Sequence, residues 1–206
     1  MCIRDRSLTA DRIEQINGIL NGTTNYILTK MAQEGSDFAD VLKEAQELGY
    51  AEKDPTADVE GLDAGRKVAI LASAAFNSRV TFEDVYTEGI TKIAATDIQY
   101  AKEMGCTIKL LGVAKDTPEG IEARVHPMLI DSNHPLATVN DSYNAVFVNG
   151  DAVENAMFYG RGAGEFPTAS AVVGDLFEIV RNIQANCCAR IGCTLSLIHI
   201  SEPTRP

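Results

Sequence analysis

The sequence predicts an α+β domain, in which a mixed, mostly antiparallel sheet has helices packed on one face. Two observations predict it. Before residue 106, apolar residues recur at helical spacing between capping residues and glycines. From 106 to 162 the pattern changes to apolar runs of strand length, and Asn149-Gly150-Asp151 between two of them is a strong hairpin signal.

The first half of the chain is expected to open with one strand, over residues 12–20. Thr23 or Thr24 is then expected to cap a helix over 25–34, because both carry the short side-chain hydroxyl that helix N-caps favour. Gly35 marks the end of this helix, since glycine readily adopts the left-handed conformation of a C-terminal cap.

Four further helical segments are expected over 38–48, 62–76, 81–84 and 98–105. Ser36 and Asp37 open the first of them and Gly49 closes it. The second is long and rich in alanine, which suits close packing in a core. The third is a short acidic turn. Asp97 is expected to cap the fourth, which ends at Gly105.

The second half is expected to supply most of the sheet. Strands are expected over 106–115, 120–130, 143–151 and 154–162. A turn over 116–120 separates the first pair. The chain then returns to a helical pattern over 168–184, and Pro167 stands at its start, where proline is well tolerated.

Size and charge limit the possible functions. A chain of 206 residues can bury one good core. Its net charge of −11 argues against a nucleic-acid partner, whose backbone needs basic residues. It contains no apolar run of transmembrane length, so we expect no membrane partner and a soluble, cytoplasmic protein. The five cysteines show no metal-binding spacing, and we assign no metal ligand.

The two ends of the chain differ from the rest. Residues 1–7 lack the apolar centre of a signal peptide, and residues 194–206 follow a helix without any clear pattern. Both resemble translated vector or adapter sequence, and a natural disordered tail is the alternative. We therefore expect the domain to span 8–193.

The segment 49–67 carries the most chemistry. Its carboxylates are Glu52, Asp54, Asp58, Glu60 and Asp63, and Lys67 stands at its end. Asp63 and Lys67 stand four apart and so share one helix face. A carboxylate-rich loop beside a lysine suits a small substrate with an ammonium group, leaving the lysine to act on an oxygen atom. The alternative is a solvated helix N-terminus with an ordinary exposed ion pair.

Three segments resemble the homoserine dehydrogenase family: INGILNGTTNYILTKM at 16–31, LKEAQELGYAEKDPTADVEGLDAGRKVAILA at 42–72 and GRGAGEFPTASAVVGD at 160–175. The resemblance runs from about Ile13 to about Asn182 and covers the family's catalytic, substrate-binding part. It implies an oxidoreductase that interconverts L-aspartate 4-semialdehyde and L-homoserine in threonine, methionine and isoleucine biosynthesis.

The resemblance also implies roles for individual residues. Lys67 would be the catalytic acid or base, protonated for reduction because of its neighbouring carboxylates, and Asp63 would orient it or reach the substrate hydroxyl. Glu52 and Asp58 would hold the substrate ammonium. The remaining substrate-binding residues would be Thr23, Tyr50 and Gly61. Asn21 and Gly22 would shape a turn.

The cofactor implied by the resemblance is NADP or NAD. Its usual GxGxxG fingerprint after a first strand has no counterpart before Asn17. We therefore expect a domain absent from this chain to bind it mainly. Gly162, Gly164 and Thr168 would face it from the start of the last helix. A tight turn that only lets this helix pack is the alternative.

In the family this sheet also serves dimerisation, so a homodimer is expected. The parent could be a monofunctional enzyme or an aspartokinase fusion. A rival hypothesis is a non-catalytic amino-acid-binding or dimerisation module, which would bind homoserine without turnover.

Overall fold

The computed structural model describes residue 8 and residues 10–184. The expected leader over 1–7 and tail over 194–206 lie outside the described residues. So do four of the five cysteines, since only Cys106 is described.

A six-stranded sheet forms the centre of the molecule, with strand order β2-β4-β3-β1-β5-β6. All neighbouring pairs are antiparallel except β2 with β4. The expected α+β class with a mostly antiparallel sheet is therefore confirmed. The strands are β1 (Ile13–Ile19), β2 (Tyr86–Thr87), β3 (Cys106–Thr117), β4 (Gly120–Asp131), β5 (Tyr143–Gly150) and β6 (Glu154–Arg161).

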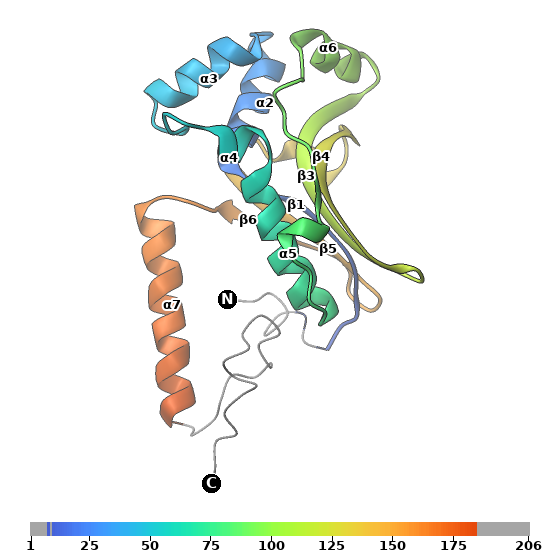
Figure 1. Cartoon of the computed structure of the whole chain (residues 1–206), viewed down its shortest axis with the longest axis vertical. Helices are drawn as coiled ribbons and strands as arrows, with labels where there is room; N and C mark the ends of the chain where they lie inside the picture. The colour runs from blue at the N-terminus through green and yellow to red at the C-terminus, as the bar shows by residue number, and fades with distance from the viewer. Residues whose placement is uncertain (1–7, 9, 185–206) are drawn as a thin grey trace.

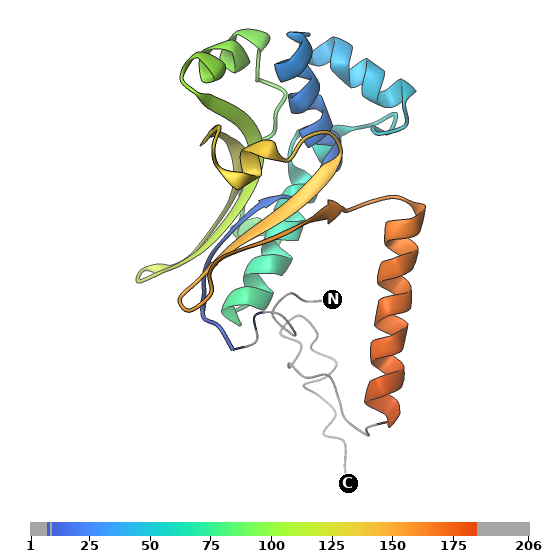
Figure 2. The same cartoon turned by 180° about the vertical axis from the view of Figure 1, so that it is seen from behind.

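Helices lie along one face and one end of the sheet (Figures 1 and 2). The helical elements are α2 (Gly22–Glu34), α3 (Phe38–Glu47), α4 (Thr56–Val59), α5 (Leu62–Phe76), α6 (Ala95–Glu103), α7 (Glu165–Gln184) and the 3₁₀ turns η1 (Phe82–Asp84) and η2 (Pro135–Thr138). The helix over 62–76 has the bounds that the sequence predicts. In the described part of the chain, no helix is long and apolar enough to cross a membrane.

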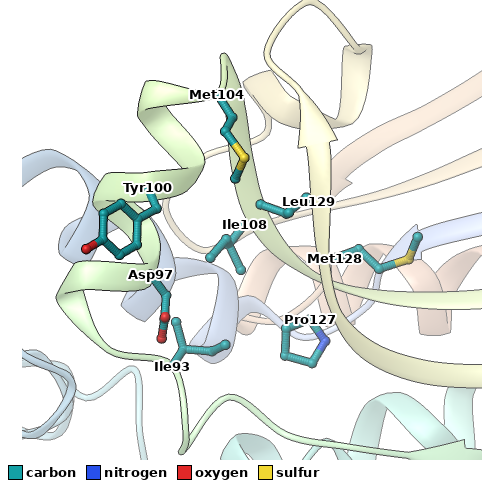
Figure 3. A pocket seen from close by; sticks show the side chains of 8 residues that line it. All are labelled: Ile93, Asp97, Tyr100, Met104, Ile108, Pro127, Met128 and Leu129. Atoms are coloured by element: carbon teal, nitrogen blue, oxygen red, sulfur yellow. The ribbon is translucent and has the colours of Figure 1, made fainter.

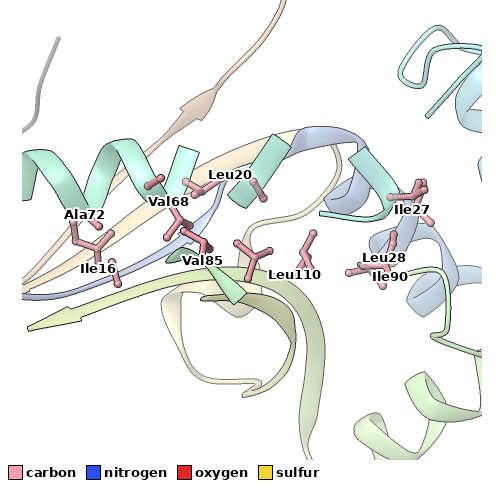
Figure 4. Packing of buried hydrophobic residues seen from close by; sticks show 14 of the residues in the cluster. Ile16, Leu20, Ile27, Leu28, Val68, Ala72, Val85, Ile90 and Leu110 are labelled. Carbon is pink, nitrogen blue, oxygen red and sulfur yellow. The ribbon is translucent and has the colours of Figure 1, made fainter. Parts of the chain in front are cut away.

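The main core lies between the sheet and α5. Val68 and Ala72 of α5 are buried beside Leu20 and Ile16 (Figure 4). The small residues of α5 let it approach the strands closely. Gly112 of β3 completes this fit, because a Cβ atom there would lie 2.3 Å from Val68 Cγ2.

A second apolar cluster covers the opposite face of the sheet. Side chains alternate between the two faces along a strand. Leu110 therefore belongs to the main core, whereas Leu111 packs with Leu136 and Val139 in the second cluster. The turn η2 and the segment that follows it cover this part of the face.

The expected cap of the first helix was wrong. Asn21, and not Thr23 or Thr24, caps α2, which begins at Gly22. The Asn21 side-chain oxygen accepts a hydrogen bond from the Thr24 N–H at 2.9 Å. Asparagine is at least as good an N-cap as threonine, and taking position 21 lets the helix begin three residues earlier than expected.

Among the other boundaries that differ from the expectation, two involve acidic residues. The acidic segment, expected as loop, contains the one-turn helix α4. Helix α6 begins at Ala95, and Asp97 lies inside its first turn, where its carboxylate accepts the Ala94 N–H at 2.9 Å. A carboxylate at this third helical position reaches back to the helix start, so an aspartate can begin a helix without being its cap.

The strand β2 and the position of α7 could not be seen in the sequence. Two residues are too short for a period to show, and only the pairing of Tyr86 with Arg124 and Thr87 with Val125 defines β2. Helix α7 stands away from the sheet in both views (Figures 1 and 2). None of its residues is buried, and Phe166 and Ile183 are among its most exposed apolar side chains.

Candidate active site

Lys67 and Asp63 form a close ion pair on the first two turns of α5. The Lys67 ammonium lies 2.6 Å from Asp63 Oδ2 and also donates to the Leu20 carbonyl oxygen at 3.0 Å. The Lys67 side chain remains 47% exposed and that of Asp63 32%. An ammonium has three N–H donors, so one of the three remains for a ligand.

Asn21 joins this pair to Asp58. Its side-chain nitrogen donates to Asp58 Oδ1 at 2.7 Å and to Asp63 Oδ2 at 3.0 Å. Asp58, Asn21, Asp63 and Lys67 thus form one hydrogen-bonded row, which we call the carboxylate–lysine row. It draws on the end of β1, on α4 and on α5.

Gly61 sets the geometry between α4 and α5. It has φ 77°, a left-handed conformation that favours glycine. Its N–H donates to the Asp58 carbonyl at 2.9 Å, and its own carbonyl accepts the Gly65 N–H at 2.8 Å. The turn therefore ends one helix and starts the next within a residue, which brings the side chains of Asp58 and Asp63 together.

The segment around Gly89 packs against the backbone of α4. The neighbouring Ile90 N–H donates to the Val59 carbonyl at 2.8 Å. A Cβ atom on Gly89 would lie 2.1 Å from that carbonyl oxygen. The segment after β2 therefore holds the backbone of α4 in place by a contact that only glycine permits.

Thr23 and Tyr50 meet beside the row. The Thr23 hydroxyl donates to the Tyr50 carbonyl at 2.9 Å, which ties the first turn of α2 to the start of the acidic segment. The Tyr50 ring packs on the Tyr26 ring, with centroids 4.7 Å apart. Tyr26 donates to Glu44 at 2.8 Å. The pKa of Tyr26 is raised mainly by burial and, to a smaller extent, by the hydrogen bond to the Glu44 carboxylate.

The other acidic residues of the segment have separate surroundings. Asp54 accepts from the Thr56 hydroxyl and N–H, which lower the pKa of Asp54. Glu60 accepts from Thr91 at 3.1 Å. Glu52 is exposed and held through its backbone carbonyl by Gln46 at 3.1 Å. No described residue links the Glu52 carboxylate to the row by a hydrogen bond.

The glycine-rich segment begins close to the start of α2. A Cβ atom on Gly162 would lie 3.0 Å from Asn144 Oδ1, and one on Gly22 would lie 3.4 Å from the same atom. Gly164 has φ 116°, and its carbonyl accepts the Thr168 N–H at 3.1 Å in the first turn of α7. Gly162, Gly164 and Thr168 are exposed, and no hydrogen bond between described residues joins them to Lys67.

The described chain does not contain a dinucleotide-binding unit of the βαβ type. Strand β6 precedes the glycine-rich segment, but it pairs antiparallel with β5, and no described parallel strand follows α7. The exposed first turn of α7 can contribute N–H groups to an anion, whereas a complete nucleotide site needs more chain than this.

A groove of about 300 Å³ lies between α6 and β4 (Figure 3), and none of its lining residues belongs to the row. Its lining is mostly apolar, and its only carboxylate, Asp97, already accepts the Ala94 N–H. Among the residues that the structure describes, no three His, Cys, Asp or Glu side chains gather into a metal site. The row is therefore the best candidate for chemistry in the described chain.

The row combines a lysine that can give or take a proton with carboxylates that can hold a cation. The sequence indicates Lys67, Asp63 and Asp58 as site residues, whereas it indicates only a turn for Asn21. The Asn-Gly pair after a strand could not show that the side chain of Asn21 reaches two aspartates 37 and 42 residues away. That contact depends on α4 and α5 packing against the end of β1.

Known proteins resemble this chain in both sequence and fold. The family model described as homoserine dehydrogenase matches residues 2–177. The chain is 56% identical over 182 residues to the homoserine dehydrogenase of Corynebacterium glutamicum, which covers 86% of this chain and 41% of that protein. The crystal structure of a homoserine dehydrogenase from Thiobacillus denitrificans superposes with TM-score 0.89 at 51% identity, covering 92% of this chain and 44% of that one.

A more distant structure is a hyperthermophilic archaeal homoserine dehydrogenase in complex with NADPH. It superposes with TM-score 0.72 at 27% identity and covers 85% of this chain and 50% of that one. The fold and these relatives define an α+β domain that makes up about half or less of each of these three proteins. The chain belongs to the homoserine dehydrogenase family, and it spans about two fifths of the length of the Corynebacterium relative.

Proposed function

We propose that this chain is the catalytic, substrate-binding part of a homoserine dehydrogenase. The reaction is the NADP- or NAD-dependent interconversion of L-aspartate 4-semialdehyde and L-homoserine in threonine, methionine and isoleucine biosynthesis. The observation that supports it most is the carboxylate–lysine row, in which Asp63 holds Lys67 at 2.6 Å. Family membership provides a reaction that needs this chemistry.

The carboxylates serve the substrate ammonium in this proposal. Asp58 accepts the Asn21 hydrogen bond with Oδ1, and its second oxygen accepts no hydrogen bond from a described residue. Asp58 and the exposed Glu52 would hold the ammonium. Thr23 lies in the first turn of α2, whose free N–H groups favour the substrate carboxylate. Tyr50 and Gly61 would shape the wall of the site through their backbone.

Lys67 handles the proton. The nicotinamide supplies or takes up the hydride when it is bound. In reduction, the third N–H of the Lys67 ammonium faces the aldehyde oxygen and stabilises its developing charge before donating the proton. In oxidation, neutral Lys67 accepts the hydroxyl proton of homoserine. The Leu20 carbonyl and Asp63 hold the nitrogen at one point for both directions.

The cofactor is held mainly by a part of the enzyme outside this chain. The length of the relatives and the antiparallel setting of β6 support this. Gly162, Gly164 and Thr168 would face the cofactor from the start of α7. The exposed apolar side chains of α7 would pack against the cofactor-binding part.

A homodimer formed through the sheet, with a domain over 8–193 in the cytoplasm, completes the proposal. The outer face of the sheet supports the dimer, because Tyr159 is 57% exposed there and Met157 packs at the edge of the second cluster. Tyr159→Glu would place a charge on this face. We expect it to halve the mass that analytical ultracentrifugation measures, whereas Lys92→Glu, on an exposed loop, leaves it unchanged.

The test of the reaction joins residues 8–184 to the cofactor-binding region of the Corynebacterium relative. NADPH-dependent turnover of aspartate semialdehyde is then measured for the wild-type sequence, Lys67→Met and Lys102→Met. Lys102 is an exposed lysine of α6. We expect Lys67→Met to lose at least about a hundred-fold in kcat, since positioned proton transfer contributes on that scale, and Lys102→Met to match the wild type.

Equal rates in Lys67→Met and wild type would remove the lysine from the chemistry. Homoserine binding by calorimetry without any turnover of the joined protein would favour the amino-acid-binding module instead.

A further inference from the structure

The side chain of Asn21 makes two separate sets of hydrogen bonds, one to the start of α2 and one to two carboxylates. It is 6% exposed and caps α2 in an extended conformation. Its Oδ1 accepts hydrogen bonds from the Thr24 N–H at 2.9 Å and the Thr24 hydroxyl at 3.1 Å. Because a backbone N–H can only donate, the atom facing it must be the amide oxygen. The amide nitrogen is therefore fixed on the other side.

The amide nitrogen of Asn21 faces two carboxylates. It donates to Asp58 Oδ1 at 2.7 Å and to Asp63 Oδ2 at 3.0 Å, so both of its N–H groups are used. Two carboxylates held this close repel each other unless a donor lies between them. Asn21 supplies this donor without adding charge.

The same short segment also holds the lysine. Leu20, next to Asn21, accepts from Lys67 at 3.0 Å, and Asp63 Oδ2 is shared between Asn21 and Lys67. Two of the three ammonium protons are thus directed by residues 20 and 63, and Asn21 fixes the oxygen of residue 63. The third proton is left with one direction in which to point.

We propose that Asn21 is a positioning residue for homoserine dehydrogenation: its amide N–H groups set the spacing of Asp58 and Asp63, and through Asp63 they aim Lys67 at the substrate oxygen. This inference rests on the proposed function of the row. The positioning role goes beyond the proposed function, because Asn21 touches neither substrate nor cofactor in this role.

A purely structural cap would need only the oxygen of Asn21. Asn21→Asp separates the two sets of hydrogen bonds, since aspartate keeps an acceptor for Thr24 and is a good N-cap. It also replaces the donor by an oxygen that faces Asp58 and Asp63. Asn21→Ser keeps the cap with a side chain too short for both carboxylates and adds no charge. Ser73→Ala is the matched stability control, because Ser73 bonds Val80 inside the core, away from the row.

The experiment measures kcat, KM for homoserine, the pH–rate profile of homoserine oxidation and urea unfolding, in residues 8–184 joined to the cofactor-binding region. For Asn21→Asp we expect a kcat at least about ten-fold lower. The ascending limb of this profile should move to higher pH, because a third carboxylate beside the ammonium favours its charged form. For Asn21→Ser we expect a comparable loss in kcat with the limb unmoved. Ser73→Ala should lower the unfolding midpoint and leave kcat and the limb as in wild type.

Wild-type kcat and an unmoved limb in both Asn21 variants would make Asn21 a cap alone and overturn the inference, while leaving the proposed function intact. A wild-type sequence that does not turn over homoserine would overturn both. If Asn21→Asp fails to fold, the kcat of Asn21→Ser decides: a lowered kcat supports the positioning role, and a wild-type kcat overturns it.

Discussion

The buried ammonium of Lys109 lies 3.0 Å from the side-chain oxygen of Asn25, which joins β3 to α2. Lys109 is 2% exposed and also donates to the Val139 carbonyl at 2.6 Å and the Asn140 side chain at 3.3 Å. All three partners are uncharged. Burial therefore lowers the pKa of Lys109 to about 8, and the charge of Asp141 opposes this shift only in part.

This relationship predicts that stability rises with pH above neutrality. An unfolded lysine keeps its proton up to about pH 10.5, whereas folded Lys109 loses it near pH 8. Between these values the unfolded state binds more protons, so the free energy of unfolding increases with pH. Below pH 8 the folded state carries the buried charge and the gain is absent.

The measurement compares urea unfolding of wild type, Lys109→Met and Lys92→Met across this range. We expect wild type to gain up to about 3 kcal/mol relative to Lys109→Met, from about 1.4 kcal/mol per pKa unit. Lys92 is exposed, so Lys92→Met should follow the wild-type curve. Parallel curves for wild type and Lys109→Met would contradict a lowered pKa.

Asn25 should be among the residues on which folding depends most. Its amide nitrogen lies within 3.1 Å of the carbonyl oxygens of Val139, Asp141 and Tyr143. Asn25→Leu would leave these carbonyls and Lys109 without this partner. We expect a loss of about 2–4 kcal/mol in the free energy of unfolding, because buried polar groups left unpaired are costly.

Asn133→Ala is the control for Asn25→Leu, since Asn133 is exposed and bonds only its neighbour Asp131 within the described chain. It should change the free energy of unfolding by less than about 0.5 kcal/mol. Similar values for the two variants, measured in urea, would show that the contacts of Asn25 do not hold the 139–143 segment.

Gly89→Ala should damage the substrate site from outside it. The added Cβ meets the Val59 carbonyl, a backbone atom that can move only with α4 and therefore with Asp58. We expect a loss of about 1–3 kcal/mol in stability from overpacking, together with weaker homoserine binding by calorimetry.

Gly160→Ala is the matched change, because a Cβ on Gly160 has no neighbour within 4 Å. It should leave both quantities close to wild type. Unchanged homoserine affinity in a destabilised Gly89→Ala would uncouple the support of α4 from the site.

Removing α7 should leave the rest of the domain as stable as before. None of the residues of α7 is buried, so the sheet and α5 lose little packing when it is absent. Chains ending at Gly164 and at Gln184 should therefore unfold at the same urea concentration, within the error of the midpoint. A clear drop in the shorter chain would show that α7 packs on the domain in solution.

Much of the architecture could be predicted because it is local. Gly35, the Asn149-Gly150 hairpin and the alanine-rich pattern over 62–76 each act within a few residues, and the end of α2, the hairpin and α5 lie where expected. The prediction of the α2 cap was wrong for a local reason, because Asn21 and the two threonines are all suitable caps and the sequence does not rank them. Strand β2 could not be predicted for a non-local reason, since its pairing partner β4 lies more than thirty residues further along the chain.

The sequence by itself determined the fold class, the spacing of Asp63 and Lys67 on one helix face, and the family to which the chain belongs. Only the tertiary structure decided that Asn21 joins Asp58 to Asp63, and that the carboxylate of Glu52 makes no hydrogen bond to this row among the described residues. The physical reason is the distance along the chain over which each interaction acts. Helical periodicity and caps act over a few residues, whereas a hydrogen bond across 37 residues exists only once packed elements bring its two ends together.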